Sequence, residues 1–372
     1  MKARRIATVT WISHRNFGTY LQAYALQHVL KHAGYFTRVI DDASVLSAMT
    51  EKKFSPVRFL RKAFSGLTYF GRNQVSVIEE YKRFKHECID IDSAWTQKED
   101  LSDRYDLFIA GSDQIWSPNV PFDDYYYLGF AAGRKIAYAP SFGSPVIPEA
   151  HIERIRPLLE HFESIAVREP SAAESLRDNM GFDVPVVSDP VLLLDALTWD
   201  SLLDSAAVRR KSEDSYALCY LLTYNPEYIN YVKSYCRQRG LKLKVVAVNK
   251  KMIGIGEDLF VGPLTFIDAI RNAEIVFTDS YHGSIFSILY EKEFLAFKRF
   301  RSSSPVDQNS RVEHLMDRLG LTSRLLDEDM LHDSWESESI DYEVVSGEVK
   351  RFREASLAVL RNMIEQDDEG DL

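Results

Sequence analysis

The sequence has few cysteines and no cluster of metal-ligating residues. Its three cysteines, Cys88, Cys219 and Cys236, are far apart and form no C-x-x-C pair. The sequence therefore predicts neither a disulfide framework nor a structural zinc site, and it indicates a reducing compartment. No apolar run approaches the length of a membrane span, and the one after the N-terminal basic residues is too short for a signal peptide. We expect a cytoplasmic protein.

An excess of positive charge is also missing. The chain carries 45 Lys and Arg residues against 55 Asp and Glu residues, a formal net charge of −10. This balance argues against broad nucleic-acid binding, so an anion site would have to be a local basic pocket. A G-x-G-x-x-G dinucleotide fingerprint is absent as well. The 372 residues are too many for one ordinary core and suit two α/β domains with a cleft between them.

The chain opens with a β-α-β pattern. Strand Ile6–Trp11 leads through a polar turn at residues 13–18 into a helix from about Thr19 to Ala33, and strand Thr37–Ile40 follows. This order predicts a parallel sheet with a ligand-facing loop at residues 13–18. Further apolar runs, each ending in small or polar residues, predict more parallel strands at 105–110, 135–139, 162–167, 216–222, 243–248 and 293–297.

We divide the chain into three parts. Residues 1–195 form a first Rossmann-type domain, residues 196–345 a second, and residues 346–372 a helix with an acidic end. The helical spacing of this last part begins at about Val344. Residues 302–310 have the composition of a loop, which makes them a candidate lid over the cleft.

The most informative segment is residues 273–290. An apolar run stops at Asp-Ser-Tyr-His-Gly and restarts with helical spacing, which predicts a strand, a tight turn and a helix whose first N–H groups bind an anion. His282 stands on this turn. A second basic cluster, Lys298 and Arg299, follows the next apolar run and falls at a neighbouring strand end. The alternative is that Gly283 serves only the turn and His282 is a structural histidine.

Residues 51–72 reverse the overall charge. Six basic residues alternate there with aromatic and aliphatic ones, and Glu51 is the only acidic residue. Two interpretations remain open for this amphipathic segment. Either it packs its apolar face on the first domain, or it lies on an anionic membrane surface at the inner face of the plasma membrane.

Six short motifs resemble those of the polysaccharide pyruvyl transferases, and they occur in the right order between residue 5 and about residue 325. They are Asn16-Phe-Gly18 with Gln22-Ala23, Gly111-Ser-Asp-Gln-Ile-Trp116, Ser141-Phe-Gly143, Val167-Arg-Glu169, Asp189-Pro190 and Thr278-Asp-Ser-Tyr-His-Gly283.

The resemblance implies a GT-B-like α/β fold, in which two Rossmann-type parallel-sheet domains enclose an interdomain cleft. It also implies transfer of the pyruvyl group of phosphoenolpyruvate to sugar hydroxyls as a ketal, with release of phosphate. Phosphoenolpyruvate would be a substrate, and no cofactor or metal would be needed. The first domain would hold the acceptor, a polysaccharide or its lipid-linked precursor. Arg168, Lys298 and the helix after His282 would bind the donor.

Ketal formation needs a proton donor at the vinyl carbon and a base for the sugar hydroxyls. His282 is the candidate acid, and Asp113 is preferred to Asn16 as base because an amide cannot accept a hydroxyl proton. Asp113 is equally suited to capping a following helix. Trp116 and residues 125–127 are candidates for stacking on a sugar, although such aromatics more often lie in the core. The remaining candidate substrate-binding residues are Arg299, Ser280, Gly283, Ser284, Asn16, Ser112 and Gln114.

Two other functional classes remain open. A nucleotide-sugar glycosyltransferase on the same architecture would need a nucleotide pocket in the second domain, and no carboxylate pair positioned for a ribose is evident there. A non-catalytic carbohydrate-binding protein of the cell envelope machinery would need no catalytic groups. Release of inorganic phosphate from phosphoenolpyruvate separates the three classes.

Overall fold

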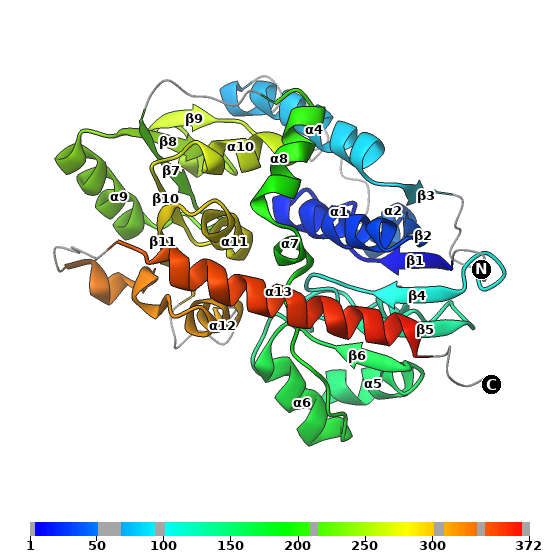
Figure 1. The fold of residues 1–372 in the computed structure, drawn as a ribbon. Helices are drawn as coiled ribbons and strands as arrows, with labels where there is room; N and C mark the ends of the chain where they lie inside the picture. Colours follow the sequence, from blue (N-terminus) through cyan, green and yellow to red (C-terminus); the bar gives the residue numbers. More distant parts are fainter. Residues whose placement is uncertain are drawn as a thin grey trace.

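The computed structural model describes residues 4–50, 68–93, 101–208, 215–300, 309–332 and 339–366. The α/β fold class predicted from the sequence is confirmed by two six-stranded sheets, in which every strand pair is parallel (Figure 1). Residues 51–67 and 301–308, which hold most of the basic segment and of the candidate lid, lie outside the described residues.

The first sheet has the strand order β3-β2-β1-β4-β5-β6. Its central strands are almost wholly buried, as expected for a parallel sheet covered on both faces. The strands are β1 (Arg5–Val9), β2 (Phe36–Ile40), β3 (Ile91–Asp92), β4 (Leu107–Ala110), β5 (Arg134–Tyr138) and β6 (Ser164–Ala166).

The second sheet has the order β12-β11-β10-β7-β8-β9. Counted from its own first strand, this is the same 3-2-1-4-5-6 order as in the first sheet, which is that of a dinucleotide-binding Rossmann fold. The strands are β7 (Tyr216–Tyr220), β8 (Lys242–Val246), β9 (Glu257–Leu259), β10 (Ile275–Thr278), β11 (Glu293–Phe297) and β12 (Leu325–Leu326).

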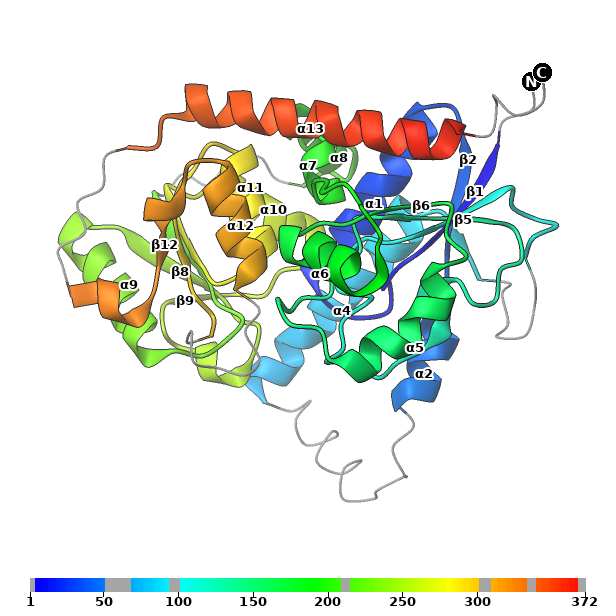
Figure 2. The same ribbon diagram turned by 90° about the horizontal axis from the view of Figure 1, so that it is seen from below.

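Helices cover both sheets and join them (Figures 1 and 2). In the first half these are α1 (Phe17–His32), α2 (Ala43–Thr50), α4 (Tyr69–Cys88), α5 (Glu149–Leu159), α6 (Pro170–Met180), α7 (Pro190–Leu193) and the 3-10 helix η1 (Asp124–Tyr127). In the remainder they are α8 (Ala196–Ser205), α9 (Pro226–Arg239), α10 (Pro263–Arg271), α11 (Tyr281–Leu289), α12 (Ser310–Arg318), α13 (Tyr342–Glu365) and the 3-10 helices η2 (Lys250–Met252), η3 (Thr322–Arg324) and η4 (Glu328–His332).

An apolar cluster crosses between the two halves. Phe17 on α1 stacks on Phe266 of α10, with ring centroids 4.3 Å apart, and on Tyr81 of α4. Aromatic pairs of this kind add about 0.5–1.5 kcal/mol each to the burial of their area. Glu80 on α4 accepts hydrogen bonds from the backbone N–H of Gly262 (3.0 Å) and the Thr265 hydroxyl (2.7 Å). The two sheets are therefore held at a fixed distance by packing and by polar contacts.

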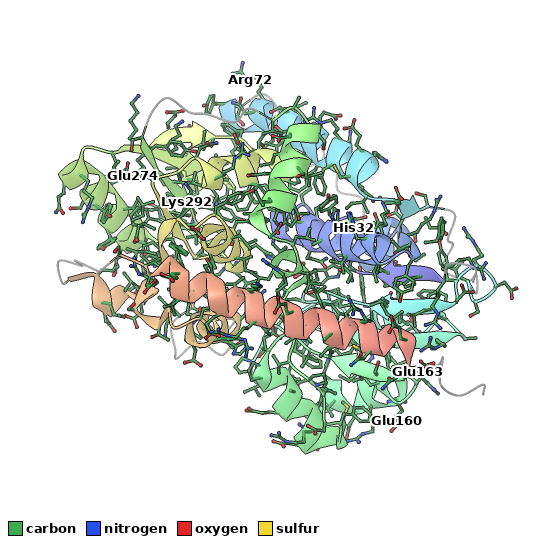
Figure 3. All side chains as sticks on the ribbon, viewed as in Figure 1. His32, Arg72, Glu160, Glu163, Glu274 and Lys292 are labelled. Carbon is green, nitrogen blue, oxygen red and sulfur yellow. The ribbon has the colours of Figure 1, made fainter. Side chains whose placement is uncertain are left out.

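Charged side chains are mostly at the surface. Arg72, Glu160 and Glu274 are exposed (Figure 3). Arg72 is also the one basic residue of the 51–72 segment that the structure describes, and it lies in the first turn of α4. Against this background, the buried charges described below are exceptions that need a reason.

The last helix, α13, returns from the second half to the first and lies across both (Figure 2). Its residues Leu360, Met363 and Ile364 join the core beneath the first sheet. Arg353 donates to the carbonyls of Leu192 (2.6 Å) and Leu194 (3.0 Å) around α7. The predicted helix is confirmed within two residues at each end. Its contacts stabilise the α7 segment. The domain boundaries at residues 195 and 345 stay predictions.

Ser356 on α13 is buried, and its hydroxyl accepts a hydrogen bond of 2.9 Å from the backbone N–H of Ser188. Replacement by alanine leaves that buried N–H without a partner, so Ser356→Ala should lower the free energy of unfolding by about 1–3 kcal/mol. The matched control is Ser346→Ala on the exposed side of the same helix, expected within about 0.5 kcal/mol of wild type. Urea unfolding of both variants measures the difference, and equal stability would show that α13 does not support this segment.

Candidate functional site

A cavity of about 310 Å³ lies where the carboxyl ends of the two sheets face each other. Its wall includes residues that follow β1, β4, β7 and β10, among them Asn16, Asp113, Leu222 and Ser280. These strands flank the point at which the strand order reverses in each sheet, which is where open α/β sheets bind ligands. The shared topology of the two halves thus brings two ligand-binding edges to one cavity.

His282 reaches the cavity from the first turn of α11. The helix begins at Ser280, whose hydroxyl accepts from the N–H of Gly283 (3.3 Å). Asn16 caps α1 in the same way, accepting from Gly18 N–H (2.9 Å). A Cβ atom at Gly18 would lie 1.9 Å from Nδ1 of His282, so only glycine leaves room for the imidazole against α1.

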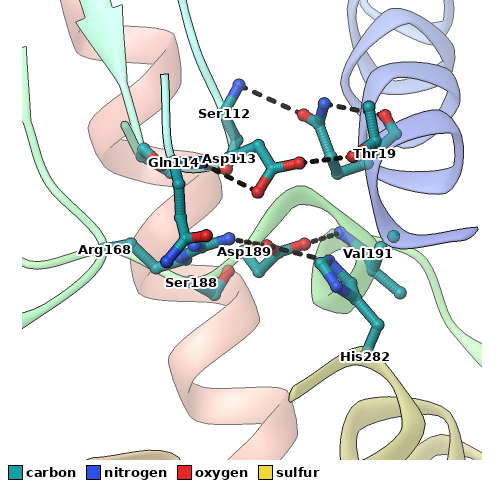
Figure 4. Close-up of polar contacts among 12 residues, drawn as sticks. Thr19, Ser112, Asp113, Gln114, Arg168, Ser188, Asp189, Val191 and His282 are labelled. Carbon is teal, nitrogen blue, oxygen red and sulfur yellow. Dashed lines mark hydrogen bonds and ion pairs between the residues drawn. The ribbon is translucent and has the colours of Figure 1, made fainter. Parts of the chain in front are cut away.

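The other ring nitrogen of His282 faces Asp189. Nε2 lies 3.4 Å from Oδ2 of Asp189, without the alignment of a good hydrogen bond, and the same oxygen accepts from Arg168 Nη1 at 2.5 Å (Figure 4). The second oxygen of Asp189 accepts from the N–H of Val191 at the start of α7. Burial alone would raise the pKa of Asp189, but His282 and Arg168 outweigh it and hold that pKa below its usual range.

Arg168 therefore has a different role from the one predicted. It is buried, pairs with Glu169 (3.2 Å) and Asp189, and does not line the cavity. Arg168 and His282 converge on the carboxylate of Asp189, and not, with Lys298, on a substrate anion. In this arrangement Arg168 positions His282 through Asp189 instead of facing a substrate.

Asp113 lies on the opposite wall. Its carboxylate accepts from the Thr19 hydroxyl (2.7 Å) and from the backbone N–H of Gln114 (2.8 Å), and its φ of 75° is left-handed (Figure 4). No helix begins here, because the described chain runs through turns from Asp113 to η1. The helix-cap alternative is thus wrong, and the site candidate remains.

Several residues predicted to bind substrate lie behind the cavity wall. Ser112 is buried. Its hydroxyl donates a hydrogen bond to the Ala139 carbonyl, and its backbone N–H donates to the side-chain oxygen of Gln22. Gly283 packs so tightly that a Cβ would lie 2.5 Å from the Thr278 hydroxyl, and the Ser284 hydroxyl bonds the Ser280 carbonyl. These residues fix the backbone conformation around the site and do not line the cavity.

The aromatic residues near Asp113 belong to the core. Trp116 is fully buried, stacks on Tyr127 with centroids 5.5 Å apart, and donates to the Tyr126 carbonyl. Gln114, by contrast, does line the cavity, and its amide nitrogen has no partner among the described residues. A Cβ at Gly143 would lie 2.0 Å from that nitrogen, which explains the glycine in this motif.

The cavity is rich in cations. Lys298 and Arg299 line it as predicted, and the structure adds Arg15 and Arg311. Lys298 is paired with Glu313 at 2.9 Å, and Arg299 donates to the Thr223 hydroxyl. In the part of the chain that the structure describes, Arg15, Arg299 and Arg311 form no ion pair with a carboxylate. Asp279 still interacts electrostatically with Arg299, as do Glu169 and Asp113 with Arg311.

Arg311 is the residue that sequence reasoning missed most clearly. It is the second residue of α12. Its guanidinium lies over the ring of Tyr281, 5.7 Å from the ring centroid, and the guanidinium of Arg168 lies 4.9 Å from the same centroid. Burial and the neighbouring Arg168 lower the pKa of Arg311 to about 10. It stays protonated at neutral pH, and its buried Nε has no hydrogen-bond partner among the described residues.

Metal ligands do not gather here. Within the described ranges no group of three or more His, Cys, Asp or Glu side chains is placed to hold a metal ion. The described helices also include none with the length and apolar character needed to cross a membrane. The expectation that activity needs no metal stays a prediction.

Asp279 adds a titratable group to the cavity wall. Its oxygens accept from the N–H groups of Leu222 (2.6 Å) and Thr223 (3.0 Å), yet burial raises its pKa to about 6. Between about pH 4 and pH 6 the folded state therefore binds more protons at this site than the unfolded state, and stability falls as pH rises.

Asp279→Asn removes this titration. The slope of unfolding free energy against pH should become more positive by up to about 1.4 kcal/mol per pH unit between about pH 4 and 6, while the exposed control Asp178→Asn keeps the wild-type slope. Urea unfolding at several pH values measures both slopes. Parallel curves for Asp279→Asn and wild type would contradict the raised pKa.

Three of the solved structures that this chain matches illustrate how low the similarity is. A UDP-GlcNAc 2-epimerase from Methanocaldococcus jannaschii is 10% identical over 97% of this chain and 99% of that chain, with a TM-score of 0.47. A putative UDP-N-acetylglucosamine 2-epimerase from Listeria monocytogenes is 10% identical over 99% and 98%, with a TM-score of 0.49. A glycosyltransferase from Streptomyces nogalater is 11% identical over 96% and 95%, with a TM-score of 0.45. Scores this low carry no argument about function.

The sequence itself is more informative. A search of curated proteins returned no match. A family model described as polysaccharide pyruvyl transferase, however, matches residues 16–299, which is well over half of the chain. This range begins at the Asn16 cap and ends at Arg299, and it contains His282, Asp189 and Asp113. The chain therefore belongs to the polysaccharide pyruvyl transferase family.

Proposed function

We propose that this transferase moves the pyruvyl group of phosphoenolpyruvate onto two hydroxyls of a sugar in a polysaccharide or its lipid-linked precursor, as a ketal, and releases phosphate. The observation that supports this most directly is the set of unpaired guanidiniums around a small cavity. Phosphoenolpyruvate carries a carboxylate and a phosphate, and arginine grips either group bidentately. Arg15, Arg299 and Arg311 supply the cations, and the start of α11 adds backbone N–H groups.

The reaction requires two additions to the same carbon. One sugar hydroxyl adds to C2 of phosphoenolpyruvate while the vinyl CH₂ gains a proton. The bond from C2 to the phosphate oxygen then breaks, and the second hydroxyl attacks the cationic carbon. Of the two hydroxyl protons, one accounts for the new methyl group and the other leaves on the phosphate.

His282 and Asp113 are assigned the proton transfers. Nε2 of His282 faces Asp189 at 3.4 Å, and Nδ1 lies on the side of Gly18 and the α1 start. We assign it the protonation of the vinyl carbon. Asp113 lies on the facing wall and takes the proton of the attacking hydroxyl. The guanidiniums stabilise the departing phosphate.

The function is tested by incubating the protein with phosphoenolpyruvate and a panel of synthetic and lipid-linked glycosides. The expected result is phosphate release that depends on the glycoside, together with the mass increment of a pyruvyl ketal in the product. Added chelator should leave the rate unchanged. Transfer from a nucleotide sugar without phosphoenolpyruvate would indicate a glycosyltransferase, and glycan binding without turnover would indicate a non-catalytic protein.

Loss of the acid should affect turnover more than binding. His282→Ala should lower kcat by about 10²–10⁴-fold with little change in KM for phosphoenolpyruvate, because a proton donor acts on the transition state. The control is His161→Ala, an exposed histidine after α5. Near-normal kcat in His282→Ala would remove the acid assignment.

Loss of an unpaired cation should affect donor binding. Arg311→Ala should raise KM for phosphoenolpyruvate by about 10–100-fold, the amount expected for one charge-assisted contact of about 1.5–3 kcal/mol. Arg311→Lys should restore part of the affinity, because the charge returns without the bidentate geometry. Arg237→Ala, on the exposed end of α9, is the matched control. An unchanged KM in Arg311→Ala would assign the donor site elsewhere.

A further inference from the structure

A second cavity of about 570 Å³ adjoins the first. The two share Arg15, Asn16, Leu222 and Arg299 as a common wall. A molecule in the second cavity therefore has direct access to the groups that we assign to the donor. The donor itself needs only the smaller, more cationic cavity.

Both halves of the protein build this second cavity. One face of α4 supplies Phe70, Gln74, Val77 and Tyr81, whose spacing of four, three and four residues places them on one side of the helix. The facing wall consists of residues 246–249 and 259–261, at the carboxyl ends of β8 and β9. The bonds from Glu80 to Gly262 and Thr265 hold α4 in place, so the cavity is a built feature of the fold.

Away from Arg15 and Arg299 at the common wall, the chemistry of the second cavity is that of a neutral glycan site. The rings of Phe70 and Phe260 are half-buried at the cavity and contact each other, with centroids 6.1 Å apart. The side-chain oxygens of Asn16 and Asn249 accept backbone N–H groups, which leaves their amide NH₂ groups for a ligand. Gln74 has no hydrogen bond within the described part of the chain.

Carboxylates are missing from this wall as far as the structure describes it. A ribose diol is commonly held by a carboxylate, so the wall does not favour a nucleoside. It also has no group that would pair with a cationic ligand. Aromatic faces with amide donors suit the apolar faces and the hydroxyls of pyranose rings.

We propose that this cavity is the acceptor subsite and that it binds a neutral glycan of at least two pyranose residues. The terminal residue lies at the common wall near Arg15 and Asn16, with its reacting hydroxyls turned to the donor cavity. The next residue lies over Phe70 and Phe260 and is held by Gln74. This assignment rests on the proposed function for the identity of the donor, but the glycan site itself is tested without it.

The test compares methyl hexosides and N-acetylhexosaminides with disaccharides and trisaccharides that carry the same terminal residue. Binding is measured by ligand-observed NMR and calorimetry in the absence of phosphoenolpyruvate, and KM is measured in its presence. Gln74→Ala should weaken binding and raise KM of the longer glycans by about tenfold, while the monosaccharide glycosides and KM for phosphoenolpyruvate stay unchanged. Gln238→Ala, an exposed glutamine on α9, is the matched control.

The outcomes separate the two proposals. Glycan binding that weakens in Gln74→Ala, without any transfer from phosphoenolpyruvate, would keep the acceptor subsite and end the proposed function. Transfer with equal kinetics in Gln74→Ala and wild type would keep the function and overturn the subsite. The subsite would also be overturned if no glycan in the panel bound. The same holds if uridine diphosphate displaced the glycans from the wild type and bound more weakly to Gln74→Ala.

Discussion

The site depends on one contact between the two halves, that of His282 with Asp189. The histidine comes from α11 in the second half, and the carboxylate precedes α7 in the first. Asp189 has no exposure to solvent, and an isolated buried carboxylate is costly, so its charge needs both Arg168 and His282. The side of the imidazole facing α1 is defined by Gly18, because any side chain there would occupy the space of the ring. Neither half alone can orient the histidine.

The packing around this contact keeps the two halves of the protein rigid with respect to each other. A change of 1 Å would separate His282 from Asp189, and such precision requires rigid support. The stacked rings of Phe17 and Phe266, the polar contacts of Glu80 and the return of α13 across both halves all oppose relative movement. Ser356 of α13 binds the residue directly before Asp189, so the last helix of the chain fixes a group that is distant from it in sequence.

Strand ends explain what the sequence predicted well. Parallel sheets bind ligands at the carboxyl ends of their strands. The residues that the sequence places at these ends all line the cavity: His282, Lys298, Arg299, Asp113 and Asn16. The strands missed, β3, β9 and β12, have two or three residues each and are too short for a periodic signal. The prediction of two Rossmann-type domains needed only the long central strands, whose buried runs are unambiguous.

Pairing between distant residues explains what the sequence did not predict. Arg311 follows a polar stretch of sequence and no apolar run, so no local pattern marks it. Arg168 was recognised as a cation at a strand end, but a sequence does not tell whether a cation will face a substrate or a carboxylate of the protein. Asp189 was recognised as part of a motif, and its role appears only when α11 is placed beside it.

Two of the cations near the cavity, Arg168 and Arg311, lie close enough to repel each other. Arg168 and Arg311 flank the ring of Tyr281, and their mutual repulsion together with burial lowers the pKa of Arg311, but only to about 10. Proton loss therefore cannot relieve the repulsion at neutral pH. Arg168 is already neutralised by Glu169 and Asp189, whereas Arg311 has no such partner among the described residues. The carboxylates of Glu169 and Asp113 offset part of this repulsion without forming an ion pair with Arg311. An anion in the cavity would balance the rest, so a protein with a net charge of −10 keeps a local site that favours a small anion over the rest of its surface.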